Sequence, residues 1–319
     1  MTRIGVISNA RSRRNRTSMR DFYALLQDHP QVKHLSFNDI SDLTECLREM
    51  AAAQVTNLVI SGGDGTVQAT VSELINNNPF RQIPKLSLLS AGMTNVIAND
   101  VGSKGLPAVS LKRLVEKIEA GSDGECLERP VLTLDLGDDG PQIHGFVFGA
   151  IGFYQGTLLS RRDVHRLGAQ QGLAAKIGIL WAALRVLWHG PGPRSGFEGE
   201  RVIASIDNEP AAPQDLFVIL STTLECLIPG VMPFWGDGPG RMKLTTVVNP
   251  PKRLARALLP AVRGRPRPWM HDLGYISRRA ENVSLEIESP VVLDGEVFET
   301  DGGSGIRLSV GPTVAFHRY

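Results

Sequence analysis

A strand-like run that leads directly into a glycine-rich turn constrains this chain more than any other feature. Residues 57–60 read Asn-Leu-Val-Ile, and Ser61-Gly62-Gly63-Asp64-Gly65-Thr66 follows them. Glycines have no Cβ, so backbone N–H groups can approach an anion, and a helix expected from Thr66 to about Asn77 would direct its positive end at the same point. The segment predicts a phosphate-binding turn in an α/β domain, with Asp64 where nucleotide phosphates and Mg²⁺ would lie.

Three further segments have a similar character. After the strand-like run 86–89 comes Ser90-Ala91-Gly92-Met93-Thr94-Asn95, which enters an expected helix from Val96. The first strand, residues 4–7, is followed by Ser8-Asn9-Ala10-Arg11-Ser12, and Val291 to Glu296 predicts a hairpin-like turn with two carboxylates. All four segments follow predicted strands, and ligands of α/β sheets bind at the carboxyl ends of strands.

The order of these segments resembles the diacylglycerol kinase catalytic domain family. This family includes bacterial lipid kinases, sphingosine kinases and ceramide kinases, with the NAD kinases as distant relatives. The resemblance spans residues 4 to about 310. It implies ATP and Mg²⁺ as cofactors, and transfer of the γ-phosphate to a hydroxyl of a diacylglycerol-like, monoacylglycerol or sphingoid lipid.

The resemblance also implies roles for individual residues. Glu296 matches the proton acceptor, Asp294 lies beside it, and Asp64 matches an essential aspartate that acts through metal or proton transfer. The candidate metal ligands are Asp64 and Asp237, and Asp237 lies in the turn Gly236-Asp237-Gly238. Nucleotide contacts are expected from Asn9, Arg11, Ser36, Gly62, Gly63, Asp64, Gly65, Thr66, Gly92, Met93, Thr94 and Asn95.

The spacing of Asp294 and Glu296 carries an expectation of its own. Alternate residues of a strand share a face, so both carboxylates would enter one cleft if Gly295 does not bulge. Two like charges held close together raise the pKa of one of them, which suits a general base that acts on an alcohol. An exposed hairpin turn is the alternative.

Two positions depart from the family pattern. Ala69 stands where the family has a glutamate, and Met93 stands where a nucleotide-contacting threonine is expected, with Thr94 next to it. A catalytically impaired nucleotide- or lipid-binding homologue therefore stays open. An NAD kinase-like enzyme is the other alternative, although the chain has no Asn-Glu dipeptide after the second glycine turn.

The length of 319 residues favours two domains. A βαβ rhythm over residues 1–124 predicts a nucleotide-binding α/β domain with a parallel sheet, and short strands over 125–305 predict a mostly antiparallel β-sandwich that binds the lipid. The resemblance implies that 306–319 returns to the first domain. An apolar face over 168–188, which includes Trp181 and Trp188, predicts a helix that packs on the second domain or lines an acyl-chain cleft.

Charge and hydropathy give expectations about partners. The net charge of +1 gives no overall attraction to nucleic acid, so no nucleic-acid partner is expected. The chain shows no signal peptide and no predicted transmembrane helix, and its scattered cysteines indicate a reducing compartment, so a cytoplasmic location is expected. The basic run 252–269 is either a solvated loop or a contact with anionic headgroups at the inner membrane face. A homodimer stays open.

Overall fold

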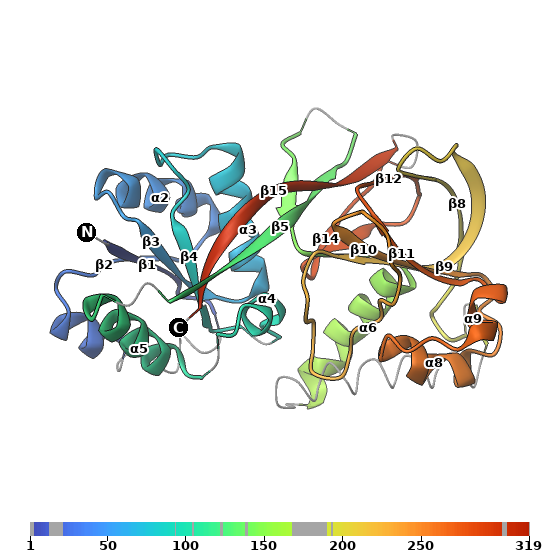
Figure 1. Cartoon of the computed structure of the whole chain (residues 1–319), viewed down its shortest axis with the longest axis horizontal. Coiled ribbons are helices and arrows are strands. Elements are labelled where there is room, and N and C mark those ends of the chain that lie inside the picture. The colour runs from blue at the N-terminus through green and yellow to red at the C-terminus, as the bar shows by residue number, and fades with distance from the viewer. Residues whose placement is uncertain are drawn as a thin grey trace. The chain divides into compact units, whose positions relative to one another are not determined.

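The computed structural model describes residues 3–12, 22–92, 94–103, 105–121, 124–137, 140–167, 190–192, 194–301 and 305–318. The chain divides into two compact units, which Figure 1 shows. The first consists of Met1–Val131, Leu224–Cys226 and Pro312–Tyr319, and the second of Leu132–Thr223 and Leu227–Gly311. Each is described by itself.

The first unit is built on a parallel sheet with the order β2-β1-β3-β4. Its strands are β1 (Ile4–Asn9), β2 (Lys33–Phe37), β3 (Asn57–Gly62) and β4 (Lys85–Ser90). Every residue of β3 is buried, as expected for a central strand covered by helices on both faces. The predicted parallel α/β domain is confirmed.

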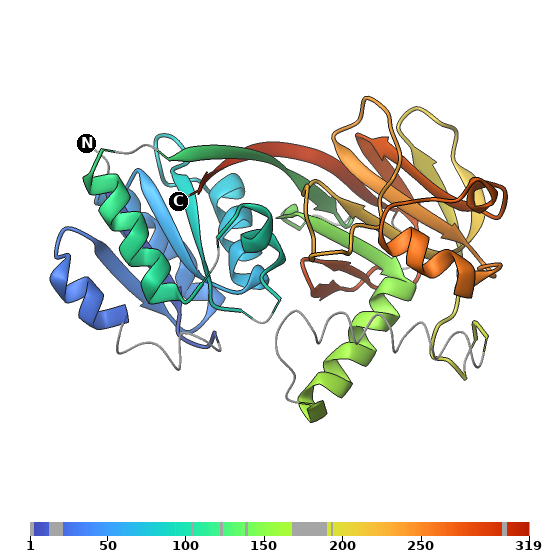
Figure 2. The same ribbon diagram turned by 60° about the horizontal axis from the view of Figure 1, so that its bottom comes forward.

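The two faces of this sheet are covered by different helices (Figure 2). Ile4 and Val6 pack with the helix over 22–28 and with α5 (Pro107–Glu119). The alternate residue Gly5 faces the other side, where an added Cβ would lie 2.6 Å from Met50 of α2 (Leu43–Ala52). This period of two makes the unit a doubly wound sheet.

The start and the inner face of α2 follow from its sequence. Asp39 caps the preceding 3₁₀ turn, η1 (Ile40–Asp42), by accepting the Ser41 N–H at 3.1 Å. The helix then buries Leu43, Leu47 and Met50, which lie on one face because they are spaced by four and three residues.

A buried polar chain joins the last strand to this sheet. β15 (Ile306–Arg318) pairs in parallel with β4 at Phe316. The imidazole Nδ1 of His317 lies 3.1 Å from the Asn57 amide nitrogen, and Ser87 Oγ donates to the Asn57 amide oxygen at 2.9 Å. Hydrogen-bonded partners offset the cost of burying these three side chains in the core.

The second unit is β-rich and antiparallel, as predicted. In this sheet the strands follow one another in the order β13 (Val291–Leu293), β7 (Val147–Ile151), β9 (Ala212–Thr222), β8 (Glu200–Ile206), β12 (Asn282–Glu286) and the first part of β15. β14 (Glu296–Phe298) pairs with β13, and β10 (Met242–Val248) joins β9 to β11 (Tyr275–Ala280). β5 (Glu125–Asp135), which begins in the first unit, pairs with β6 (Ile143–Gly145). A cluster of buried aliphatic side chains and Phe148 forms the core.

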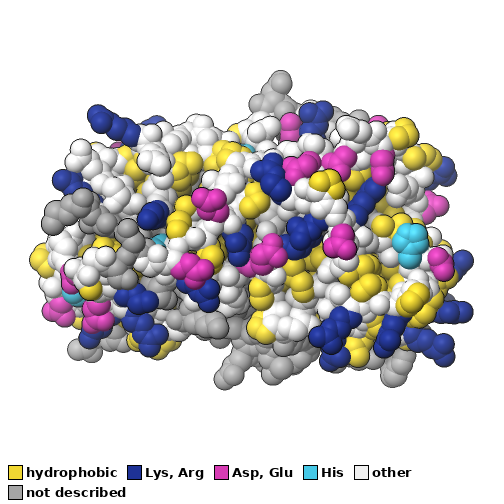
Figure 3. Space-filling view, in the orientation of Figure 1, with side chains coloured by type: hydrophobic (Ala, Val, Ile, Leu, Met, Phe, Trp, Pro, Cys, Tyr) yellow, Lys and Arg dark blue, Asp and Glu magenta, His cyan; other side chains and the backbone are white. Residues whose placement is uncertain are grey.

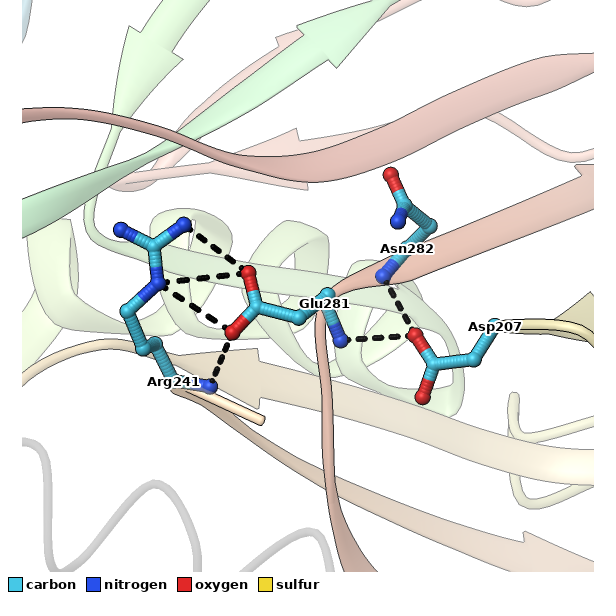
Figure 4. Close-up of polar contacts among 4 residues, drawn as sticks. All are labelled: Asp207, Arg241, Glu281 and Asn282. Carbon is cyan, nitrogen blue, oxygen red and sulfur yellow. Dashed lines mark hydrogen bonds and ion pairs between the residues drawn. The ribbon is translucent and has the colours of Figure 1, made fainter. Parts of the chain in front are cut away.

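A polar corner fixes the approach of β8 to β12 (Figure 4). Asp207 has a φ of +52°, and its carboxylate accepts the N–H groups of Glu281 and Asn282 at 2.8 and 2.9 Å. The Glu281 carboxylate in turn accepts the Arg241 backbone N–H at 2.7 Å and the guanidinium at 2.9 to 3.3 Å. These bonds organise a strand corner and belong to the scaffold.

Several elements differ from the predictions. A helix directly follows β7, α6 (Gly152–Leu167), where none was expected, and the helix predicted over 168–188, with Trp181 and Trp188, lies outside the described residues. The basic run expected as a loop contains two helices, α8 (Leu254–Val262) and α9 (Pro268–Asp272). Each of these helices buries one residue fully, Ala257 in α8 and Met270 in α9. Among the described residues, no helix is long and apolar enough to cross a bilayer.

Candidate active site

The strand order places the candidate site at the point where the sheet changes direction. The chain leaves β1 to reach β2 on one side, whereas β3 and β4 lie on the other side. Ligands of doubly wound sheets bind outside the carboxyl ends of the strands at such a switch point. Here those ends are Asn9 of β1 and Gly62 of β3.

Two of the predicted nucleotide-binding residues meet across the switch point. The amide nitrogen of Asn9 donates to Thr66 Oγ1 at 3.0 Å, and its amide oxygen accepts the Arg11 N–H at 2.9 Å. Asn9 therefore holds the loop after β1 against the turn after β3, although 57 residues separate it from Thr66.

The two glycine turns touch each other through their backbones. A Cβ added to Gly92 would lie 2.4 Å from the Gly63 Cα, so no side chain fits at this position. The N–H of Ala91 also donates to the Gly62 carbonyl at 3.1 Å. The structure thus brings the turns after β3 and β4 together at one edge of the sheet.

The first of these turns opens α3 (Asp64–Asn76), which begins two residues before the predicted start. Gly63 is the N-cap residue, and no side chain caps the helix. The Thr66 and Val67 N–H groups both donate to the Gly63 carbonyl, at 3.0 and 3.1 Å. The uncapped positive end of a 13-residue helix at a switch point suits a phosphate group.

The carboxylate of Asp64 joins this turn to α4 (Val96–Asp100). Its Oδ1 accepts the Ile97 N–H at 3.1 Å. Burial raises the pKa of the Asp64 carboxyl, and the backbone N–H groups of Val96, Ile97 and Asn95 act in the opposite direction. In this structure Asp64 therefore has a positioning role, and its role as a metal ligand stays a prediction.

Asn95 completes the second turn. It has a φ of +52°, and its side chain accepts the Gly92 N–H at 2.9 Å and donates to the Gly92 carbonyl at 3.0 Å. Asparagine is among the residues that adopt this left-handed backbone most readily. Thr94 is exposed, and Met93 lies outside the described residues.

Ser36 and Arg11 lie at the outer part of the same sheet edge. Ser36, in β2, is exposed and donates through Oγ to the Ser8 carbonyl at 3.3 Å. The exposed Arg11 guanidinium lies 3.8 Å from the Asp39 carboxylate. Their side chains are available to a ligand in this unit, and their contacts with nucleotide stay predictions.

The carboxylate turn of the second unit is a two-residue β-hairpin. Leu293 pairs with Glu296, and the central residues Asp294 and Gly295 have φ values of +50° and +88°. Two positive φ values define a type I′ turn, for which Asp-Gly is a favoured sequence. The predicted hairpin-like turn is confirmed, whereas the condition for a shared strand face is not met. Asp294 and Glu296 are separated by the reversal of the chain, so alternation along one strand does not relate their side chains.

The carboxylate of Asp294 binds the backbone of the neighbouring strand. It accepts the Phe146 N–H at 3.0 and 3.1 Å and the Val147 N–H at 2.8 Å, while the Asp294 N–H donates to the Val147 carbonyl at 2.8 Å. A Cβ on Gly145 would lie 2.6 Å from Asp294 Oδ2, so glycine is required there. Asp294 thus anchors the turn, and the exposed Glu296 begins β14 immediately after it.

The donor set fits a phosphate group better than a metal cage. Among the described residues, no three His, Cys, Asp or Glu side chains come together as metal ligands. Mg²⁺ is usually held by one or two carboxylates together with substrate phosphates. A site built on Asp64 therefore fits Mg²⁺ only as an ion that nucleotide phosphates help to hold. Asp237 is exposed, and its carbonyl lies 3.4 Å from the Arg279 N–H.

A further buried carboxylate was missed by the sequence analysis. The Asp100 side chain has 0% exposure, forms a 2.7 Å ion pair with Arg129, and accepts the N–H groups of Glu225 and Cys226 at 2.9 and 2.7 Å. It fixes the segment 224–226 to the end of α4 within the first unit. The sequence around Asp100 does not predict this role, because the partners of Asp100 are distant in the chain. Arg129 lies 29 residues away, and Glu225 lies 125 residues away.

A glycine turn and a helix start at the switch point of a doubly wound sheet define a phosphate-binding α/β domain. Residues 3–123 match the model of the diacylglycerol kinase catalytic domain. This match identifies a diacylglycerol kinase catalytic domain in the first unit, and such a domain is the catalytic domain of a lipid kinase.

Solved structures share the fold over the whole chain. Two structures of a candidate diacylglycerol kinase from Bacillus anthracis str. Sterne align with TM-scores of 0.65 and 0.66, and a structure of a diacylglycerol kinase from the same strain aligns with 0.62. Each is 16% identical and covers 99% of this chain and 97% of its own. No curated protein matches the chain.

Proposed function

We propose that the chain is an ATP- and Mg²⁺-dependent kinase that transfers the γ-phosphate to a hydroxyl of a diacylglycerol-like or sphingoid lipid. The contact of Gly63 with Gly92 beside the uncapped start of α3 carries this proposal. The contact leaves no side chain between the two turns at the carboxyl edge of the sheet, beside the switch point at which nucleotide phosphates bind in such sheets.

The roles follow from what phosphoryl transfer requires. ATP supplies the phosphoryl group and Mg²⁺ offsets its charge, so the protein has to position the reactants and accept one proton. Backbone N–H groups of residues 63–65 would bind the phosphates, because the Thr66 N–H already donates to the Gly63 carbonyl. Glu296 would accept the proton from the lipid hydroxyl, because its carboxylate is exposed at the start of β14. Asp294 would keep the turn in place.

The site of action follows from the substrate. A lipid with long acyl chains stays in the bilayer, so the kinase would work as a cytoplasmic protein that visits the inner membrane face. The exposed position of Glu296 supports this proposal, since a lipid hydroxyl at the surface of a bilayer has to reach it.

Transfer of label from γ-labelled ATP with Mg²⁺ tests the function. The acceptors are diacylglycerol, monoacylglycerol, sphingosine, ceramide and NAD, each offered separately. We expect one lipid to be labelled, and we expect Glu296→Gln to lower the rate at least about 100-fold because the proton acceptor is lost. Glu299→Gln is the matched control, since Glu299 is also an exposed carboxylate near β14.

Three outcomes would contradict the proposal. Labelled NADP in place of a labelled lipid would show an NAD kinase. ATP binding without transfer to any acceptor would show a catalytically impaired homologue, with Ala69 in the helix that follows the turn as the first position to restore to glutamate. If Glu296→Gln and Glu299→Gln lowered the transfer rate equally, Glu296 would not be the proton acceptor.

A further inference from the structure

A dense stretch of basic residues without a nearby acidic residue in sequence lies over α8 and α9 of the second unit. Residues 250–270 contain no Asp or Glu, although the whole chain is close to neutral with 34 basic and 33 acidic residues. The stretch contains Lys252, Arg253, Arg256, Arg263, Arg265 and Arg267.

All six of these side chains are exposed. Within the described part of the chain, none of the six forms an ion pair, whereas Arg241 and Arg278 of the same unit are paired with Glu281 and Glu209. Figure 3 shows Lys and Arg side chains gathered at the lower right, where Figure 1 places α8 and α9, with hydrophobic side chains between them. With respect to the residues that the structure describes, these charges therefore face solvent without a carboxylate in ion-pair distance.

An apolar tip lies within this basic surface. Leu259 of α8 is 56% exposed, and Leu258, Pro260 and Val262 are half-buried. The half-buried Trp269 of α9 lies under the Arg253 guanidinium, 5.9 Å from its ring centre. Such a combination of an aliphatic tip, an aromatic ring and a basic rim is typical of helices that lie in a membrane interface.

The surface is held rigidly on the second unit. Ala257 and Met270 pack with Tyr275 and Val247 of the sheet, and the Tyr275 hydroxyl donates to the Lys252 carbonyl at 2.8 Å. Between the helices, Gly264 has a φ of +61°, and an added Cβ would lie 2.6 Å from the Met232 carbonyl. The two helices therefore present their outer side chains as a preformed surface.

We propose that α8 and α9 form a docking surface for an anionic lipid bilayer, with the basic side chains on phosphate headgroups and Leu259 inserted between them. This rests on the proposed function insofar as a lipid kinase has to meet a membrane. Nucleic acid also attracts basic residues, but an exposed leucine gains nothing from phosphates, so the apolar tip favours a bilayer.

Sedimentation with vesicles, without ATP, tests the docking. The vesicles consist of phosphatidylcholine with phosphatidylglycerol as the minor component, and phosphatidylcholine alone serves for comparison. The triple variant Arg263→Gln, Arg265→Gln, Arg267→Gln is expected to lower the partition coefficient about 100-fold, which is about 3 kcal/mol at about 1 kcal/mol per basic residue. At about 1 M salt, where charges are screened within about 3 Å, wild-type binding should fall similarly.

Matched controls separate a local surface from net charge and from general hydrophobicity. The triple variant Arg81→Gln, Arg113→Gln, Arg201→Gln removes the same charge from exposed residues elsewhere and should retain binding. Leu259→Asp should lower binding at least about tenfold, since an apolar contact is lost and a like charge faces the lipid. Leu106→Asp should not, although Leu106 is also 56% exposed.

The outcomes distinguish the docking surface from the kinase activity. The docking surface would be refuted if all variants bound vesicles equally, or if both triple variants lost vesicle binding to the same extent. This would hold even if every variant transferred label to a short-chain diacylglycerol. Binding to duplex DNA but not to vesicles, lost in the α8–α9 variant, would assign the surface to nucleic acid. Vesicle binding that depends on α8 and α9 without any label transfer would support the docking surface and refute the kinase.

Discussion

Replacing Asp294 is expected to reduce stability, whereas replacing its neighbour Glu296 is expected to reduce activity alone. The Asp294 carboxylate accepts the N–H groups of Phe146 and Val147 at 2.8 to 3.1 Å, so Asp294→Ala leaves both donors without their charged acceptor. Hydrogen bonds to a charged group contribute about 1.5–3 kcal/mol each, and the half-buried position favours the lower end. The loss is therefore about 3 kcal/mol.

The backbone adds a smaller contribution. Asp294 has a φ of +50°, and alanine in this left-handed region costs about 1 kcal/mol more. Asp294→Ala should thus lower the free energy of unfolding by about 4 kcal/mol. Asp294→Asn should lower it by about 1–2 kcal/mol, because Asn-Gly is a favoured type I′ sequence and its amide oxygen still accepts one N–H.

Urea unfolding followed by circular dichroism measures these differences, with label transfer measured on the same preparations. Glu296→Gln should keep the wild-type free energy of unfolding within about 0.5 kcal/mol, since Glu296 is exposed and its replacement keeps the size of the side chain. If Asp294→Ala is as stable as the wild type and yet inactive, the carboxylate acts in the chemistry and the anchoring role assigned to it is refuted.

Two further predictions concern a buried histidine and the contact between the glycine turns. Burial lowers the pKa of His144 from 6.5 to about 4, so the neutral ring stabilises the fold above pH 6.5 and this contribution is lost as the pH falls through about 4. Between pH 7 and pH 4, the free energy of unfolding of the wild type should fall by roughly 3 kcal/mol more than that of His144→Asn. Urea titration at the two pH values measures both losses, and equal losses would contradict the effect of burial on this pKa. Gly92→Ala should weaken ATP binding, measured by calorimetry, at least about tenfold, because the new Cβ would lie 2.4 Å from the Gly63 Cα. Gly156→Ala is the control and should bind ATP normally, since its Cβ would lie 3.6 Å from Phe197.

The sequence predicted the first unit well because its signals are local. Continuous apolar runs such as 57–60 mark central parallel strands, and glycine turns after them mark helix starts, so the order of strands and helices followed from patterns a few residues long. The second unit was harder. α8 and α9 were expected as a loop, since Pro260 and a run of arginines obscure a helix that buries Ala257 alone.

The carboxylates illustrate what a local pattern leaves open. Asp-Gly-Glu indicated a turn, but its type decided whether the side chains share a face, and that depends on the pairing of Leu293 with Glu296. Likewise the partners of Asp294 lie 147 and 148 residues away in sequence. Spacing within the motif carries no information about them.

The residue types at the candidate site were determined by the sequence: glycines where backbone approaches backbone, Asn9 and Thr66 after two strands, and the acidic pair of the hairpin. The tertiary structure alone decided which of them meet. In it, Gly63 contacts Gly92 and Asn9 is hydrogen-bonded to Thr66. The carboxylates of Asp64 and Asp294 accept backbone N–H groups. The physical reason is that turn chemistry depends on neighbours in the chain, whereas the partner of a buried polar group is set by sheet order and register, which form only when distant strands pack together.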